Sequence, residues 1–172
     1  MASEAGSDPR YDGDMLDAAA PMPVVTAEDV KRLVVEKIPL LGLLPVSVEE
    51  ASAAQVRLHL PYASVLCNHA GGLHAAAQFA AAETAALVVG YLLLPTAGVT
   101  CISKAVDLRL RKIARADLWA TAQPEKGTGE SAALAVRLTA EGKVDVPILV
   151  ALVDASGERV ADGTVTINVR RL

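Results

Sequence analysis

Residues that could do chemistry gather at the start of one apolar stretch, "NHAGGLHAAAQFAAAETAALVVGYLLLP", which runs from Asn68 to Pro95. A single carboxylate, Glu83, lies inside the apolar run. The Gly71-Gly72 pair allows close approach of a ligand or of another backbone, because neither residue has a side chain. Free N–H groups around Leu73 to Ala76 would form an anion-binding helix end. A carbonyl oxygen placed there would be polarised as in an oxyanion hole.

Helix geometry separates Glu83 from that helix start. Glu83 comes eight positions after Ala75 (83 − 75), which corresponds to about 12 Å along a helix axis. Glu83 also lies about 180° around the helix from His74, whereas Gln78 lies near His74. Glu83 therefore cannot act at the start of its own helix. If two copies pack with these helices antiparallel, Glu83 of one chain meets the helix start of the other, which predicts a site shared by a homodimer.

The elements that position this helix are predicted from hydrophobic periodicity and turn residues. A first helix is predicted to begin at the candidate N-cap Thr26 and to end at Pro39. Two short strands, possible partners in a hairpin, precede the apolar helix. Strands are predicted after it at 106–111, 117–123, 133–138, 144–153 and 164–169.

This order of elements predicts an α+β domain in which one curved antiparallel sheet wraps the apolar helix. Residues 25–172 are expected to form this single domain, preceded by a mobile tail at 1–24. Pro147 is expected to place its strand at a sheet edge or in a bulge, because proline lacks the N–H of a sheet ladder. His59 is expected to point outward into solvent.

Composition excludes several classes of function. The 172 residues are 52% hydrophobic but only 3% aromatic, with a net charge of −4. Few aromatic rings and net negative charge argue against a nucleic-acid partner. Glu83 near the centre of the apolar run argues against a membrane span. Three histidines and scattered carboxylates show no metal-ligand spacing, and two isolated cysteines indicate a cytoplasmic protein with reduced thiols.

The pattern Asn68-x-x-Gly71-x-x-His74-Ala75-Ala76-x6-Glu83 resembles a known family signature. It is similar to that of hotdog-fold acyl-CoA thioesterases of the phenylacetate-degradation type and of related uncharacterised hotdog domains. Their pattern is Asn-x-x-Gly-x-x-His-Gly-Gly-x6-Asp (or Glu), and the spacing matches without a gap. The resemblance covers roughly residues 26–171 and implies the hotdog fold, a curved sheet around one long central helix.

The resemblance also implies roles for four residues. Glu83 takes the place of the catalytic carboxylate, a general base on water or a nucleophile at the thioester carbon. The N–H of Ala75 is placed to polarise the thioester carbonyl. Asn68 matches the residue that orients water or the carboxylate, and His74 matches the histidine beside the oxyanion position. No metal or organic cofactor is implied, since coenzyme A enters only as part of the substrate.

Substrate contacts are predicted from the same resemblance and from charge. Ala75-Ala76 replaces the family Gly-Gly, which keeps the N–H groups but adds methyl groups that narrow the approach. Thr100 and Ser103, on the strand after the helix, occupy a region where some family members carry a water-positioning hydroxyl. The predicted substrate contacts are Gly71, Gly72 and Ala76 at the helix start, and Arg111, Lys112 and Arg115 in the cationic cluster "RLRKIAR" for the phosphates of coenzyme A.

Alternatives remain open from the sequence. His69 and Glu83 are fourteen residues apart (83 − 69), a spacing found in hotdog hydratases and dehydratases, although the Pro-rich segment of those enzymes is missing. The frame could also bind acyl chains without catalysis, with Glu83 as a structural carboxylate. The sequence does not distinguish carrier-protein thioesters from coenzyme A thioesters as substrates. A tetramer of two dimers agrees with the resemblance, as a dimer does.

Overall fold

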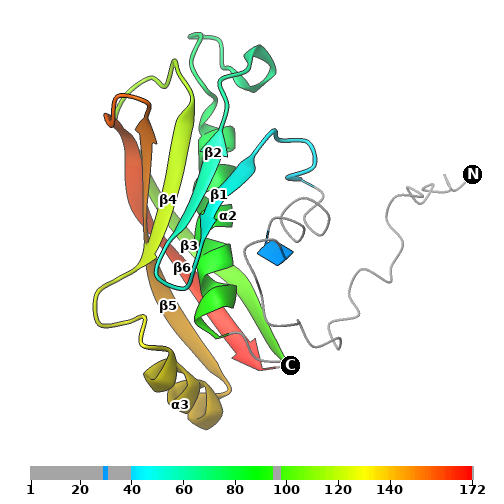
Figure 1. The fold of residues 1–172 in the computed structure, drawn as a ribbon, viewed down its shortest axis with the longest axis vertical. Coiled ribbons are helices and arrows are strands. Elements are labelled where there is room, and N and C mark those ends of the chain that lie inside the picture. The colour runs from blue at the N-terminus through cyan, green and yellow to red at the C-terminus, as the bar shows by residue number, and fades with distance from the viewer. Residues whose placement is uncertain (1–28, 31–39, 95–97, 172) are drawn as a thin grey trace, which may run out of the picture.

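A six-stranded antiparallel sheet with a long helix across one face forms the molecule (Figure 1). This computed structural model describes residues 29–30, 40–94 and 98–171. The predicted tail and all but two residues of the predicted first helix lie outside these ranges. The strands are β1 (Ser47–Ala51), β2 (Val56–Leu60), β3 (Val99–Leu110), β4 (Leu118–Pro124), β5 (Lys143–Asp154) and β6 (Arg159–Arg171). The helices are α2 (Ala75–Leu93), α3 (Ser131–Glu141) and a short 3-10 helix (Ser64–Leu66).

The sheet follows the order β1-β2-β4-β5-β6-β3, so that β1 and β3 are its two edges. Alternating apolar residues turn one face of each strand toward the core, as the sequence predicts. Val165, Ile167 and Val169 of β6 are all completely buried. The predicted hairpin of two short strands is confirmed by the antiparallel pairing of β1 with β2. The predicted α+β class and the wrapped-helix plan are therefore confirmed.

Small residues let α2 lie close to the sheet. The helix packs mainly against β2, β3, β4, β5 and β6, and its buried side is mainly alanine, valine and glycine. A Cβ at Gly90 would lie only 2.8 Å from Cγ2 of Ile167, so no larger residue fits there without movement. α2 is long and apolar enough to cross a membrane, but 61% of its most apolar window is buried within this fold. It is the core helix of the domain, as predicted.

The strand predicted at 133–138 is wrong, because this segment forms helix α3. Leu134, Val136 and Leu138 alternate with other residues and so imitate a strand. Only Leu134 and Leu138 are buried, at helical i, i+4 spacing, whereas Val136 is 70% exposed. Gly142 ends the helix with a φ of 71°, and its N–H donates to the carbonyl of Leu138 at 2.9 Å.

The edge or bulge predicted at Pro147 is also wrong, because β5 lies between β4 and β6. Pairing of β5 with β4 reaches only as far as Ile148, which lies opposite Pro124. Pro147 is the next residue, and its carbonyl accepts a bond from the N–H of Glu125 at 3.1 Å, just past the end of β4. A proline fits this central strand because no ladder N–H is needed from it toward β4.

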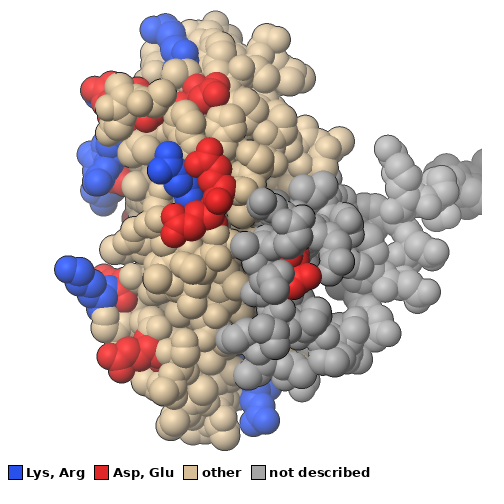
Figure 2. Space-filling view, in the orientation of Figure 1, with Lys and Arg blue, Asp and Glu red and all other residues tan. Residues whose placement is uncertain are grey.

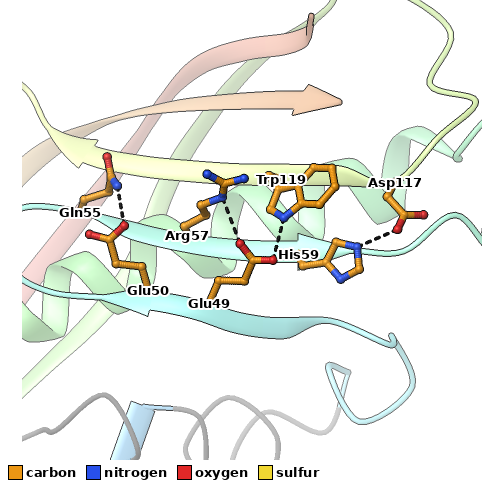
Figure 3. A network of polar contacts seen from close by, with 7 residues as sticks. All are labelled: Glu49, Glu50, Gln55, Arg57, His59, Asp117 and Trp119. Carbon is orange, nitrogen blue, oxygen red and sulfur yellow. Dashed lines mark hydrogen bonds and ion pairs between the residues drawn. The ribbon is translucent and has the colours of Figure 1, made fainter. Parts of the chain in front are cut away.

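His59 points outward from the sheet, as predicted, but it is not simply solvated. It joins a network on the outer face of β1, β2 and β4 (Figure 3). Its Nε2 lies 2.9 Å from Oδ2 of Asp117, and its ring lies 5.0 Å from that of Trp119. Trp119 donates its indole N–H to Oε1 of Glu49 at 2.7 Å, and the guanidinium of Arg57 lies 5.5 Å from its ring centroid. These contacts tie the short β1–β2 hairpin to the rest of the sheet.

Candidate active site at the start of helix α2

Asn68 shapes the turn that leads into α2. Its Oδ1 accepts hydrogen bonds from the backbone N–H groups of Ala70 at 2.9 Å and Gly72 at 3.3 Å. Its own N–H donates to the carbonyl of Gly72 at 2.8 Å. Gly71 has a φ of 69°, a left-handed conformation that glycine adopts without strain. Asn68 therefore holds the turn, and the water-orienting role implied by resemblance stays a prediction.

The segment after β3 supports this turn from behind. A Cβ at Gly72 would lie 2.4 Å from Cγ2 of Ile113 and 3.0 Å from the carbonyl oxygen of Ala114. Gly72 is therefore required for this close packing, and its contact with a substrate stays a prediction. Arg115, a predicted substrate contact, donates a hydrogen bond from Nη2 to the carbonyl of Ala70 at 3.3 Å and so stabilises the turn.

Three of the four N–H groups at the helix start already have acceptors. Leu73 donates to a carbonyl of the segment after β3 at 2.8 Å, and His74 donates to the carbonyl of Leu66 at 2.7 Å. Ala76 donates to Nδ1 of His74, the N-cap residue, at 3.0 Å. The N–H of Ala75 has no acceptor within the described part of the chain. The structure thus narrows the predicted anion-binding end to one N–H group, that of Ala75.

Gln78 stabilises the helix start from inside the protein. It is only 3% exposed, and its Nε2 donates to the carbonyl of Leu73 at 2.9 Å. Its Oε1 is buried and has no hydrogen-bond partner among the described residues. From the sequence, Gln78 is expected to be a polar packing residue at the helix start or at the dimer seam. The structure shows that it also anchors the residue before the N-cap, and so helps to fix the position of Ala75.

Glu83 lies farther along α2, half-buried, where the helix passes under the edge strand β3. The hydroxyl of Ser103 on β3 donates a hydrogen bond to Oε1 of Glu83. This contact holds the carboxylate away from the turn of its own chain. The helical axis from Ala75 to Glu83 measures about 12 Å at 1.5 Å per residue. Ala75 and Glu83 of one chain are therefore not brought together.

The predicted cationic contacts separate in space. Nε and Nη2 of Arg111 both lie 2.8 Å from Oδ1 of Asp162, and Lys112 pairs with Glu158. Arg115 binds the turn instead. Figure 2 shows basic and acidic side chains interspersed on the face it draws, not one continuous basic surface. The cluster seen in the sequence is therefore not a single cationic patch.

His69, the histidine of the hydratase alternative, is an exposed residue of the turn. It precedes the start of α2, so the length of the helix also keeps it from Glu83 of its own chain. Within residues 40–94 and 98–171, no group of three or more His, Cys, Asp and Glu side chains is arranged to hold a metal ion. The expectation that no metal is needed stays a prediction.

A curved antiparallel sheet around a central helix, with a capped helix start beside a glycine turn, defines a hotdog-fold protein. The sequence matches the family described as "Domain of unknown function (DUF4442)" over residues 26–169. The chain belongs to this family. No protein among the curated proteins matches the sequence.

Solved structures share the fold over nearly the whole chain. PA5026 from Pseudomonas aeruginosa, a protein of unknown function described as a "Probable Thioesterase", is 26% identical, with a TM-score of 0.74 over 89% of this chain and 100% of that one. Thioesterase HI1161 from Haemophilus influenzae is 16% identical, with a TM-score of 0.70 over 88% of this chain and 94% of its own. A mutant of thioesterase PA1618 from Pseudomonas aeruginosa is 18% identical, with a TM-score of 0.70 over 87% and 97%. The hotdog fold predicted from the sequence is confirmed.

Replacing Asn68 by Ala should lower the free energy of unfolding by about 0.5–1.5 kcal/mol, because two N–H groups of the turn lose their acceptor. Asn68→Asp keeps an acceptor oxygen at Oδ1 and should remain close to the wild type. Urea unfolding of the three proteins measures the difference. Equal destabilisation by both substitutions would contradict the turn-holding role of this oxygen.

Proposed function

We propose that this chain is a cytoplasmic thioester hydrolase that acts on acyl-CoA or acyl-carrier thioesters without a metal or an organic cofactor. The observation that carries the proposal is the N–H of Ala75, the one helix-start N–H that lacks an acceptor within the described residues. The His74 cap, the Gln78 anchor and the Asn68 turn hold it in place. Solved structures with the same fold that are named thioesterases support the same reaction.

The chemistry needs only an oriented water and a polarised carbonyl. The N–H of Ala75, at the positive end of the helix dipole, binds the thioester oxygen as negative charge develops on it. Glu83 takes a proton from water, whose oxygen bonds to the carbonyl carbon. The carbon–sulfur bond then breaks, and the proton passes from Glu83 to the departing thiolate. The products are a carboxylic acid and a free thiol.

The two groups meet only if two chains share the site. Edge strand β3 pairs with β6 on one side, and no strand of the described chain pairs with its other side. A twelve-residue edge strand is a template for pairing with another chain, and Ile102 on it is 47% exposed. A twofold contact here would run the two α2 helices antiparallel and bring Glu83 of one chain toward Ala75 of the other. The functional unit we propose is therefore a homodimer, alone or paired into a tetramer.

A second candidate function is the binding of acyl thioesters without hydrolysis. It is favoured by one feature, the replacement of the family Gly-Gly by Ala75-Ala76. The added methyl groups narrow the space in front of the N–H, although Ala76 itself is exposed and Ala75 is only partly buried. Binding of a non-hydrolysable acyl-CoA together with no turnover of any acyl-CoA would select this function.

Replacing Glu83 by Gln should lower kcat for acyl-CoA hydrolysis at least ~100-fold, because the amide cannot accept a proton from water. Binding of a non-hydrolysable acyl-CoA should persist, since the substitution preserves size and shape. Release of free thiol, followed with a thiol reagent on a panel of acyl chain lengths, measures kcat. Ser103→Ala serves as the control for the hydrogen bond to Glu83 and should reduce kcat less. Equal kcat in wild type and Glu83→Gln would exclude Glu83 as the base.

Replacing Ala75 by Pro tests the oxyanion position directly, because proline has no backbone N–H and a ring carbon takes the place of that hydrogen. Proline is favoured at the first residue of a helix, and His74 before it already has φ −61° and ψ 143°, which a following proline requires. The fold should therefore persist, while kcat falls by about 10²–10³-fold, as expected for loss of one oxyanion donor.

Ala75→Gly is the matched control, since it keeps the N–H and removes the methyl group. It should retain or increase kcat, and widen the range of accepted acyl groups. Thermal unfolding verifies that both variants are folded. A folded Ala75→Pro protein with unchanged kcat would show that another group polarises the carbonyl.

A further inference from the structure

A hollow of about 500 Å³ lies on the outer face of the sheet, away from α2. A cross-strand row crosses it, in which Thr121 of β4 lies opposite Ala151 of β5, and Asp162 of β6 lies between Ala151 and Arg109 of β3. Thr121 and Ala151, the residues of β4 and β5 in this row, have small side chains. The longer side chains of Asp162 on β6 and Arg109 on β3 extend farther from the sheet, which leaves a hollow above β4 and β5. Because the sheet separates this hollow from α2, it is not where Ala75 would meet a thioester.

Two guanidinium groups contact one carboxylate at this hollow, and a third arginine lies opposite it on the neighbouring strand. Oδ1 of Asp162 accepts from Nε of Arg111 at 2.8 Å, and Oδ2 accepts from Nη1 of Arg159 at 3.2 Å. The hydrogen bond from Arg111 lowers the pKa of the Asp162 carboxyl, with a further contribution from Arg159. Arg109 lies directly opposite Asp162 in the β3–β6 register. Around Asp162 itself, three positive charges therefore face one negative charge.

Arg109 supplies the unused binding capacity. It has no ion pair or hydrogen-bonded side-chain partner within the described ranges, while Asp162 is already engaged by two other arginines. A guanidinium carries five N–H donors in a planar fork that matches phosphate oxygens. Asp107, two residues before Arg109 on the same face, lines the hollow too. Its negative charge repels an anion, so an anion is favoured at the end of the hollow that holds the three arginines.

We propose that this outer-face hollow binds a phosphate-bearing small molecule, with its phosphate on Arg109 and supported by Arg111 and Arg159. The volume lies in the range of small-molecule sites. Leu149 also lines the hollow, is 45% exposed, and offers an apolar surface for an organic ring. The chemistry fits a nucleotide, whether it is the nucleotide end of coenzyme A or a free nucleotide, and it also fits inorganic phosphate.

Binding at this hollow is independent of thioester hydrolysis, because it involves neither Ala75 nor Glu83. In this proposal Arg109 binds the phosphate in place of Lys112 and Arg115, the contacts predicted from the sequence. Lys112 pairs with Glu158, and Arg115 binds the turn before α2. Of the probes used below, only coenzyme A relates to both the hollow and the hydrolysis site. A failure of hydrolysis would therefore leave the binding result unchanged.

The test is a binding titration of the full chain with adenosine 3′,5′-bisphosphate, inorganic phosphate, coenzyme A and unphosphorylated adenosine. Trp119, the single tryptophan, lies two residues from Thr121 on the same face of β4 and serves as the fluorescent reporter. The bisphosphate should bind, and Arg109→Gln should weaken it at least ~10-fold, as loss of a charge-assisted hydrogen bond predicts. Arg137→Gln, on α3 and outside the hollow, is the matched control and should bind as the wild type does.

The outcomes separate the possible occupants. Tighter binding of the bisphosphate or coenzyme A than of inorganic phosphate, lost in Arg109→Gln, supports a nucleotide, and equal binding of all three supports recognition of phosphate alone. The proposal is overturned if adenosine binds as well as its bisphosphate, or if Arg109→Gln binds as tightly as wild type. It is also overturned if no probe binds. A lower molecular mass of Arg109→Gln in sedimentation would then identify the face as an interface between copies.

Discussion

Close packing of α2 against the sheet depends on small side chains along the buried side of the helix. Gly90 leaves no room for a Cβ beside Ile167, and alanines occupy most of the remaining contact. Such packing fixes the helix as one rigid element that carries both candidate catalytic groups. Because Ala75 begins this element and Glu83 lies about 12 Å along it, packing that holds both residues in place also keeps them apart within one chain. A site that uses both therefore needs a second chain, and this constraint underlies the homodimer proposed above.

Much of the fold could be predicted because the core strands alternate cleanly. Val165, Ile167 and Val169 are buried as their spacing indicates, and the start of α2 at Ala75 follows from the glycine turn before the alanine run. The error at 133–138 arose because its apolar residues satisfy both periods, and only tertiary packing chose the helical one. The prediction of an edge or bulge at Pro147 failed for a similar reason, because the local sequence does not show where β4 stops pairing with β5.

The site could be predicted only in part, because hydrogen bonds from distant segments determine which groups remain free. Asn68, His74 and Glu83 are visible in the sequence by type and spacing. Among the described residues at the helix start, Ala75 is the one whose N–H has no acceptor, because carbonyls of Leu66 and of the segment after β3 bind the two preceding N–H groups. No local pattern predicts these contacts. Likewise, the cluster 109–115 looks like one cationic patch, but Lys112 pairs with Glu158 and Arg115 binds the carbonyl of Ala70, contacts that the local sequence does not predict.

The two faces of the sheet thus have different chemistry. The inner face is apolar and holds the helix that carries Glu83. The outer face carries the Trp119 network (Figure 3) and, farther along the sheet, the arginines around Asp162. Asp162 binds Arg111 and Arg159 at once, which leaves an excess of positive charge next to Arg109. A single sheet therefore supports two proposed sites that substitutions can address separately.

Mixed dimers test the shared site most directly. Chains carrying Glu83→Gln and chains carrying Ala75→Pro, each with a different affinity tag, are unfolded, mixed and refolded, and dimers with both tags are isolated. In such a dimer, one site combines the intact Ala75 of one chain with the intact Glu83 of the other. If the site is shared between subunits, the mixed dimer regains about half of the wild-type kcat, because one of two sites is complete. A mixed dimer as inactive as either variant alone would contradict the shared site.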